Sequence, residues 1–394
     1  MQTVALVLFL LSFAVLFYTI FGYPIVLALH RRSGAPIRKE FVPRSVSVVI
    51  AVYNGATFLR GKLESLLTVD YPRELMEILV VSDGSTDETE AIATEFAARG
   101  VRLLRVPRGG KAAALNAAIP QLSGDILVLT DVRQALAPDS LHLLIACFAD
   151  PTVGAVSAGL RILPGERREE SDMGLYWRYE IWMRKHMSRI GSTFGTNGPY
   201  YAMRRELAGP IPPDTLLDDV VLLLPALFRG YRIILEPAAE AFDFPTNLKS
   251  EFRRKMRTLG GLWQVFLRHP ALLGSANPMR FHFVSQKIGR LLLPYALLGL
   301  TFSAFGLPAP WRTAVLAAVA LFYALGLVDL VVPQKFILKR VTSPIRSFLV
   351  MCAAAFCAVS VFFVPPQRLW KVTTVSRPAA GAEGSATGGS GTTP

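Results

Sequence analysis

Polar and charged side chains stand at the ends of several predicted strands of this chain, which is where open α/β sheets bind their ligands. They occur in four segments: Tyr53-Asn54, Ser82-Asp83-Gly84-Ser85, Gly109-Gly110-Lys111 and Thr130-Asp131-Val132-Arg133. A single Asp after a strand is more often a turn or a helix cap than a ligand contact. Four such segments on one edge of one sheet indicate a binding site.

The residue types in these segments suit a nucleoside diphosphate. A carboxylate such as Asp83 accepts hydrogen bonds from a base or a ribose, and Lys111, at a predicted helix N-terminus, pairs with phosphate oxygens. Asp131 is a candidate ligand for a divalent cation, Mg²⁺ or Mn²⁺, that neutralises a leaving diphosphate. A Walker A loop is excluded, because Ala112 stands where a hydroxyl residue is required and the upstream glycine is absent.

A pair of carboxylates, Asp218-Asp219, precedes an apolar helical segment. Carboxylates at a helix N-terminus often act as caps and interact favourably with the helix dipole. They also suit a general base, which takes the proton from an attacking hydroxyl. The residues alone leave both interpretations open.

These candidate residues depend on a regular alternation of strands and helices. Apolar runs predict strands at 46–52, 76–81, 101–106 and 125–130, and helical periodicity predicts helices at 58–67, 86–99 and 111–119. Near-continuous apolar strands alternating with helices predict an α/β fold with a parallel-rich sheet covered on both faces. Residues 45–285 have an ordinary soluble composition, and we expect them to form one domain with a full core.

Apolar runs flank that domain at 3–29, 291–307, 313–332 and 345–364. Each is long enough to cross a bilayer. We therefore expect an N-terminal transmembrane helix within residues 1–29 and a C-terminal transmembrane region of about three helices within residues 290–365.

Basic residues suggest which side of the membrane the domain occupies. Arg31 and Arg32 follow the first run, so the positive-inside rule predicts that the domain is cytoplasmic. Arg368 and Lys371 follow the last run and conflict with the outside location that four spans give the C-terminus. The Gly-, Ser- and Ala-rich tail, residues 378–394, is predicted to be disordered.

The overall composition agrees with a membrane protein. Hydrophobic residues make up 52% of the chain and charged residues only 18%, with a net charge of +13. Because the basic clusters lie beside apolar runs, we attribute the charge to contact with membrane lipid and expect no nucleic-acid partner. Three cysteines without CxxC spacing and five scattered histidines predict neither a disulfide framework nor a zinc site.

The motifs described above resemble those of the family 2 glycosyltransferases, specifically the membrane-bound branch with the cellulose, hyaluronan, chitin and poly-N-acetylglucosamine synthases. The matching segments are SVVIAVYN, VVSDGSTDET, GGKAAALNAAI, TDVRQ, GTNGPYYAMRRE, LLDDVVLLLPALFRGYRI and EFRRKMRTLGGLWQ. The resemblance covers roughly residues 1–377 and implies a GT-A fold between transmembrane helices.

The resemblance also implies roles for individual residues. It implies donor binding by Tyr53, Asn54, Asp83, Ser85, Lys111, Asp131 and Arg133, with Asp83 at the uracil or ribose and Lys111 near the diphosphate. It implies acceptor binding by Gly198, Tyr200, Arg254 and Arg257. Asp219, with Asp218 beside it, is the implied general base, and Asp131 is the implied metal ligand.

The sequence departs from the family pattern at two motifs. Arg133 stands where the DxD motif has its second Asp, which leaves Asp131 as a single carboxylate for a cation. Thr258 stands where the QxxRW motif of processive members has its tryptophan, while Arg257 is kept. The first departure makes the cation requirement an open question, and the second does the same for processive polymer synthesis.

The interpretation that follows is a multi-pass membrane glycosyltransferase, expected in a bacterial inner membrane. It would transfer a sugar, with inversion, from a nucleotide-sugar donor such as a UDP-sugar to a polysaccharide or lipid-linked acceptor of the cell envelope. A transferase of single sugars to a polyprenyl or glycolipid acceptor, a nucleotidyltransferase and a non-catalytic membrane scaffold are the alternatives.

Overall fold

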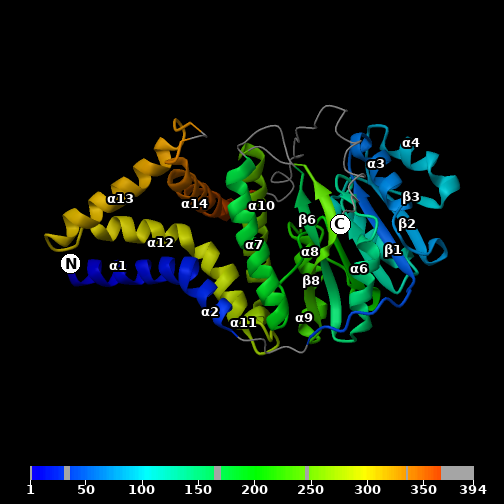
Figure 1. Cartoon of the computed structure of the whole chain (residues 1–394), viewed down its shortest axis with the longest axis horizontal. Helices are drawn as coiled ribbons and strands as arrows, with labels where there is room; N and C mark the ends of the chain where they lie inside the picture. Colours follow the sequence, from blue (N-terminus) through cyan, green and yellow to red (C-terminus); the bar gives the residue numbers. More distant parts are fainter. Residues whose placement is uncertain (1, 31–35, 164–169, 245–247, 334–335, 365–394) are drawn as a thin grey trace, which may run out of the picture.

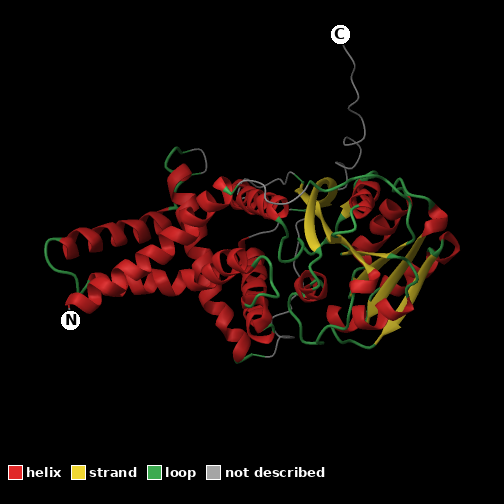
Figure 2. Ribbon diagram, turned by 90° about the horizontal axis from the view of Figure 1, so that it is seen from below, coloured by secondary structure: helices red, strands yellow, loops and turns green. Residues whose placement is uncertain are grey.

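The chain has two parts, a domain built on a β-sheet and an extension of long helices (Figures 1 and 2). The computed structural model describes residues 2–30, 36–163, 170–244, 248–333 and 336–364, without the side chains of 170–177, 248, 249 and 251. Helices α7 (Glu170–Ile190) and α10 (Leu248–Arg268) lie between the two parts. The predicted tail and the basic residues Arg31, Arg32, Arg368 and Lys371 lie outside the described residues.

The domain contains an eight-stranded mixed sheet with the strand order β3-β2-β1-β4-β7-β6-β8-β5. Strands β3, β2, β1 and β4 are parallel, β7 is antiparallel to both β4 and β6, β8 is parallel to β6, and β5 is antiparallel to β8. The strands are β1 (Val46–Val52), β2 (Met76–Asp83), β3 (Val101–Val106), β4 (Ile126–Thr130), β5 (Ala135–Leu136), β6 (Val153–Ile162), β7 (Tyr200–Arg204) and β8 (Arg232–Asp243).

Each face of the sheet is covered by its own set of helices, which explains the apolar strands. In β1, Val48 and Ile50 contribute to one core and Val49 to the other. The first core lies under α3 (Ala56–Leu67), α4 (Thr89–Glu95) and α6 (Ser140–Ala146). The second lies under α5 (Lys111–Ala118), α7, α8 (Asp218–Val221), α9 (Leu224–Phe228) and α10.

The prediction of a parallel-rich sheet covered on both faces is confirmed for the first half of the domain. The second half is mixed, because β7 runs antiparallel to both β4 and β6, while β6 and β8 are parallel. The helix predicted at 86–99 begins only at Thr89, since the Asp87 carboxylate accepts the Thr89 N–H at 3.0 Å and closes a turn ahead of the helix.

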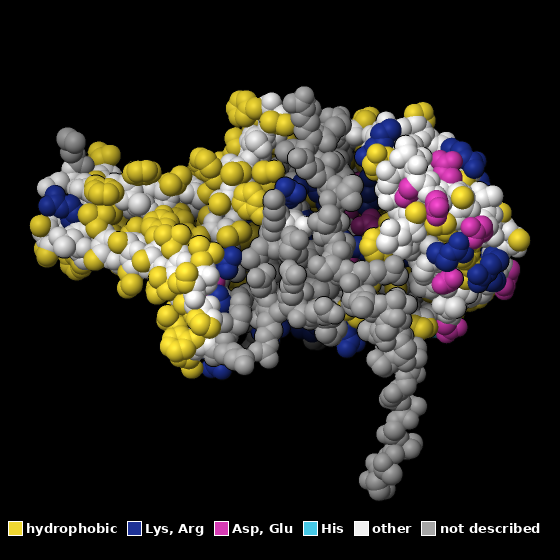
Figure 3. Space-filling model, turned by 90° about the horizontal axis from the view of Figure 1, so that it is seen from above, with side chains coloured by type: hydrophobic (Ala, Val, Ile, Leu, Met, Phe, Trp, Pro, Cys, Tyr) yellow, Lys and Arg dark blue, Asp and Glu magenta, His cyan; other side chains and the backbone are white. Residues whose placement is uncertain are grey.

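The helical extension contains α1 (Gln2–Phe17), α2 (Tyr23–Leu29), α11 (Arg280–His282), α12 (Gly289–Ala304), α13 (Trp311–Val328) and α14 (Lys339–Cys357). Helix α12 packs along α1, and α14 packs against α10, α12 and α13. Apolar side chains are prominent on the face of the extension that Figure 3 shows. Within the part of the chain that the structure describes, three helical segments are long and apolar enough to cross a membrane, namely Gln2–Leu29, Trp311–Val328 and Lys339–Phe362. Helix α12, at the predicted apolar run 291–307, is shorter and has sixteen residues.

Candidate active site

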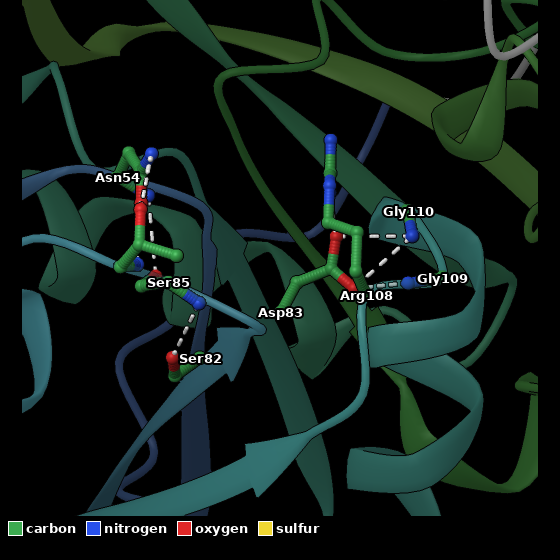
Figure 4. A network of polar contacts seen from close by, with 8 residues as sticks. Asn54, Ser82, Asp83, Ser85, Arg108, Gly109 and Gly110 are labelled. Carbon is green, nitrogen blue, oxygen red and sulfur yellow. Dashed lines mark hydrogen bonds and ion pairs between the residues drawn. The ribbon is translucent and has the colours of Figure 1, made fainter.

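The ends of β1 and β2 carry a turn that joins the first two polar segments. Asn54, in a left-handed conformation with φ of 49°, donates its N–H to Ser85 Oγ at 3.1 Å (Figure 4). Its side-chain oxygen accepts the N–H of Thr86 at 2.8 Å. Gly84 has a φ of 66°, and a Cβ there would lie 2.9 Å from the Arg108 nitrogen, so only glycine fits this close approach. The sheet thus brings Asn54 and Ser85 together, as predicted.

Asp83 holds the loop that precedes α5. Its carboxylate accepts the N–H groups of Gly109 at 2.7 Å and Gly110 at 3.0 Å, and it forms an ion pair with Arg108 (Figure 4). The Arg108 guanidinium lies 3.7 Å from the centre of the Tyr53 ring, which is a cation–π contact. Both oxygens of Asp83 are therefore engaged by the protein, and Arg108 and Tyr53 present the exposed surface at this point.

Lys111, the first residue of α5, links two carboxylates from distant parts of the chain. Its Nζ lies 2.8 Å from Asp131 Oδ1 and 3.0 Å from Asp218 Oδ2. Burial alone would lower the pKa of Lys111, but the two carboxylates raise it well above its usual value. Burial opposes the ionisation of Asp131, but Lys111 holds the pKa of Asp131 below its usual value. The structure therefore joins the predicted diphosphate, metal and base segments through one lysine.

Asp219 follows at the start of α8 and has an unusual pKa for an aspartate. Burial and the charge of Asp218 raise its pKa to about 6, although Lys111, Arg184 and Lys287 act in the opposite direction. A carboxylate with that pKa is ionised at neutral pH and accepts a proton more readily than an ordinary Asp. The electrostatics of the site therefore suit proton abstraction at Asp219.

The loop ahead of β7 faces Asp219. Gly198 has a φ of 86°, and a Cβ at this position would lie 3.8 Å from Asp219 Oδ2. Asp131 donates its N–H to Pro199 O at 2.9 Å, so the loop is tied to the end of β4. Gly198 is thus brought to the site.

Tyr200 is not brought to the site. Its side chain is fully buried, and its hydroxyl lies 3.3 Å from Ser140 on the face that α6 covers. Successive residues of a strand point to opposite faces, so Tyr201 takes the position expected of Tyr200. The charges of Asp218, Lys111 and Asp219 act on the buried Tyr201 hydroxyl, which has no hydrogen-bond partner among the described residues.

Arg133 contacts Asp243, a residue that the sequence motifs did not predict for the site. Its guanidinium donates two hydrogen bonds to Asp243, at 2.8 Å from Nε and 2.7 Å from an Nη. The Asp243 side chain is 2% exposed and that of Arg133 17%. This bidentate pair ties the loop after β4 to the end of β8.

Helix α10 brings Arg257 to the carboxylates. Burial lowers the pKa of Arg257, while the charges of Asp218, Asp131 and Asp219 raise it, so all three lie within its electrostatic range. Arg254 lies one turn earlier and also acts on Arg257. Thr258, at the position of the motif's tryptophan, donates its hydroxyl to the Arg254 carbonyl at 2.9 Å.

Lys62 is a residue of the site region that the sequence motifs did not identify. It is 2% exposed, and its Nζ donates to Thr130 Oγ1 and to the Gln134 carbonyl, both at 2.7 Å. These two acceptors bracket Asp131-Val132-Arg133, so Lys62 holds both ends of that segment. Burial lowers the pKa of Lys62 to about 7. A lysine on the apolar face formed by Leu59, Leu63 and Leu66 was the available signal.

Comparisons with known proteins identify similar glycosyltransferases. Residues 47–209 match the family model "Glycosyl transferase family 2". An N-acetylglucosaminyltransferase of Rhizobium meliloti (strain 1021) is 28% identical over 360 residues, which cover 83% of this chain and 82% of that protein. A poly-beta-1,6-N-acetyl-D-glucosamine synthase of Staphylococcus aureus (strain COL) is 25% identical over 235 residues, covering 57% of this chain and 56% of that protein.

A solved structure has a similar fold over nearly the whole chain. The mannosyltransferase PcManGT from Pyrobaculum calidifontis, solved in complex with GDP-Man and Mn²⁺, is 26% identical, with a TM-score of 0.71. The match covers 92% of this chain and 99% of that one.

A GT-A-like mixed sheet with a lysine and carboxylates at its strand ends defines an enzyme that transfers a sugar from a nucleotide-sugar donor. Residues 47–209 match the family 2 glycosyltransferases, and the enzyme is a glycosyltransferase. The nucleotidyltransferase and the non-catalytic scaffold are therefore set aside.

Proposed function

We propose that the protein is an inverting membrane glycosyltransferase that moves a sugar from a nucleotide-sugar donor, of the UDP-sugar class, to a hydroxyl of a polysaccharide or lipid-linked acceptor. One observation carries this proposal. Lys111 contacts Asp131 and Asp218 at once, and Asp219, whose pKa is raised to about 6, is the next residue in the chain. Lys111, which binds the diphosphate, and Asp219, which acts as the base, are therefore close together.

The donor lies across the carboxyl ends of β1, β2 and β4. Lys111 pairs with the diphosphate when the donor enters, and Asn54 and Ser85 shape the adjoining turn. Asp83 acts at the base or ribose together with Arg108 and Tyr53, whose stacked side chains provide a surface for that part of the donor.

The transfer begins when Asp219 accepts the proton of the acceptor hydroxyl. The hydroxyl oxygen forms a bond to the anomeric carbon, and the bond from that carbon to the diphosphate oxygen breaks. The electron pair leaves with the nucleoside diphosphate, whose charge Lys111 stabilises. Asp218 keeps Asp219 basic through its own charge. Direct displacement on one face of the sugar inverts the anomeric configuration.

The residues at the end of β4 fit a divalent cation through Asp131. Lys111 binds Oδ1 of Asp131, which leaves Oδ2 available, and Mg²⁺ is commonly held by one or two carboxylates together with substrate phosphates. Among the described residues, no three His, Cys, Asp or Glu side chains form a metal cluster. Asp131 would hold the cation together with the donor diphosphate, and the bound cation would neutralise charge on the leaving group.

The acceptor reaches Asp219 from the side of α10. Gly198 leaves space beside the Asp219 carboxylate, and Arg257 and Arg254 bind oxygens of the acceptor. Tyr200 acts only indirectly, through the position of Gly198 and Pro199, because its own side chain is buried elsewhere.

A membrane location is supported by the three apolar helical segments and by basic residues near them. The catalytic domain, residues 45–285, lies on the cytoplasmic side, between the N-terminal helix and the C-terminal helices, and we assign the protein to a bacterial inner membrane. The chain serves the synthesis of a cell-envelope or extracellular polysaccharide.

A single-sugar transferase acting on a polyprenyl or glycolipid acceptor is the second candidate. The observation that favours it is Thr258, whose hydroxyl bonds to the helix backbone where processive relatives carry a tryptophan. A ladder of products from one acceptor would contradict it, and one product would support it.

The experiment is a donor screen with protein purified in detergent and native lipid. UDP- and GDP-sugars are tested with Mn²⁺, with Mg²⁺ and with a chelator, and release of the nucleoside diphosphate is measured. We expect turnover with one donor class, its loss in Asp219→Asn and its retention in Asp214→Asn, whose side chain pairs with Arg268. Full turnover in Asp219→Asn would refute the base assignment, and no turnover with any donor and acceptor would refute the proposed function.

A further inference from the structure

A second cluster of charges lies between α7 and the π-helical segment Phe283–Ile288 that leads into α12. Glu180 is 7% exposed and forms an ion pair with Arg290, which neutralises both. Arg184 lies 3.9 Å from the same carboxylate, and the charge of Lys287 also acts on Glu180. Lys255 also acts on Glu180, so four cations surround this carboxylate. Asp219 acts on Lys287 as a second carboxylate, and the cluster still has more cations than carboxylates.

Arg184 and Lys287 carry this excess charge. Among the described residues, Lys287 makes no hydrogen bond and no ion pair. Arg184 forms a long ion pair with Glu180, at 3.9 Å. Burial and the neighbouring charges of Arg184 and Arg290 lower the pKa of Lys287 to about 8. Cations that repel one another in a partly buried position are stabilised by a bound anion.

The cluster adjoins the catalytic carboxylate. Arg184 and Lys287 both act electrostatically on Asp219. Phe283, one turn before Lys287, packs against Phe194, with 5.3 Å between the ring centres. Phe194 directly precedes the loop that faces Asp219. A ligand held by the two cations therefore lies on the Asp219 side of the site, away from the strand ends that hold Asp83.

The cluster also adjoins the apolar extension. Tyr18, at the junction of α1 and α2, contacts Ser285 at 2.7 Å, two residues before Lys287. Lys and Arg side chains gather at the boundary between the apolar helices and the rest of the molecule (Figure 3). This boundary is where the head group of a lipid would be if the helices span a membrane.

We infer that Arg184 and Lys287 bind a phosphate group of the acceptor, so that the acceptor is a phosphate-bearing molecule, lipid-linked, whose sugar hydroxyl meets Asp219. The inference rests on the proposed function and names its acceptor class. A guanidinium and an ammonium together suit phosphate oxygens. The donor diphosphate is not the anion in question, because Lys111 binds it at the strand ends. The apolar tail of the acceptor follows the helices of the extension.

The test measures binding of three probes in the presence of saturating UDP, so that the donor site is filled. The probes are phytanyl diphosphate, phytanol and inorganic diphosphate. The test variant is Arg184→Gln with Lys287→Gln, and Arg189→Gln, an exposed residue of α7, is the matched control. A charge-retaining variant, Arg184→Lys with Lys287→Arg, separates loss of charge from a folding defect.

We expect the wild-type protein to bind phytanyl diphosphate at least about tenfold more tightly than phytanol, because charged hydrogen bonds to phosphate are strong. The double Gln variant should lose that difference, while the control and the charge-retaining variant keep it. Equal binding of inorganic diphosphate, with the same loss in the double variant, would identify a soluble phosphate-bearing acceptor instead of a lipid.

The inference is overturned if the wild-type protein binds phytanol as tightly as phytanyl diphosphate, or if the double Gln variant retains the preference. Donor turnover is measured in the same preparations. If the wild-type protein prefers phytanyl diphosphate but turns over no donor, the proposed function alone is refuted. If it turns over a donor but shows no preference for phytanyl diphosphate, the phosphate site alone is refuted.

Discussion

The pKa of Asp219 predicts how the transfer rate depends on pH. Burial and the charge of Asp218 raise this pKa to about 6. A base acts in its ionised form, so activity is lost as the pH falls through that value. Asp219 is almost fully ionised near pH 7.5 and about one-tenth ionised near pH 5, so kcat/KM for the acceptor should fall about tenfold. An ordinary Asp, with a pKa of about 3.9, would stay mostly ionised and give an almost flat profile.

The assay is release of the nucleoside diphosphate at saturating donor, measured across this pH range. A sample returned from about pH 5 to about pH 7.5 must recover its rate, which separates titration from acid denaturation. Asp218→Asn removes the like charge beside Asp219, so the acid limb should move to lower pH in that variant. A flat profile down to about pH 5, or an acid limb that persists in the residual activity of Asp219→Asn, would refute the base assignment.

Three further substitutions test the remaining contacts. Lys62→Met leaves two buried acceptors unpaired, at a cost of about 1–3 kcal/mol each, so a lower Tm and a higher donor KM are expected. An unchanged donor KM would contradict the role of Lys62 in positioning Asp131. Asp243→Asn leaves Arg133 without its charged partner and should destabilise the protein by about 3–5 kcal/mol, which thermal unfolding measures. An unchanged Tm would show that the pair is not important for stability. Lys111→Met should raise the donor KM at least about tenfold, since the diphosphate loses its cation, and normal donor binding would contradict that role.

Local patterns were sufficient to predict much of the first half of the domain. The strands expected at 46–52 and 101–106 have those bounds in the structure, because each is a short apolar run between turn residues. The parallel order then brings the strand ends together, which is why Lys111 and Asp131 meet as the sequence suggested.

The second half was not predictable in the same way, since its strands pair across long separations. Residue Tyr200 was expected in the site, but the phase of β7 is set by its pairing with β4 and turns Tyr201 inward instead. The hydrogen bonds from the Gly109 and Gly110 backbone to Asp83 were also not predicted. Backbone partners of this kind leave no signal in side-chain types.

The pair formed by Arg133 and Asp243 restricts how this site can change during evolution. Both side chains are largely buried, and two facing carboxylates in such a position would not both ionise. A relative that carries Asp at position 133, with the usual two-acid motif, should therefore carry a neutral or basic residue at position 243. The two positions are expected to co-vary across the family, and the charge at position 243 would then indicate which members hold a cation with two carboxylates.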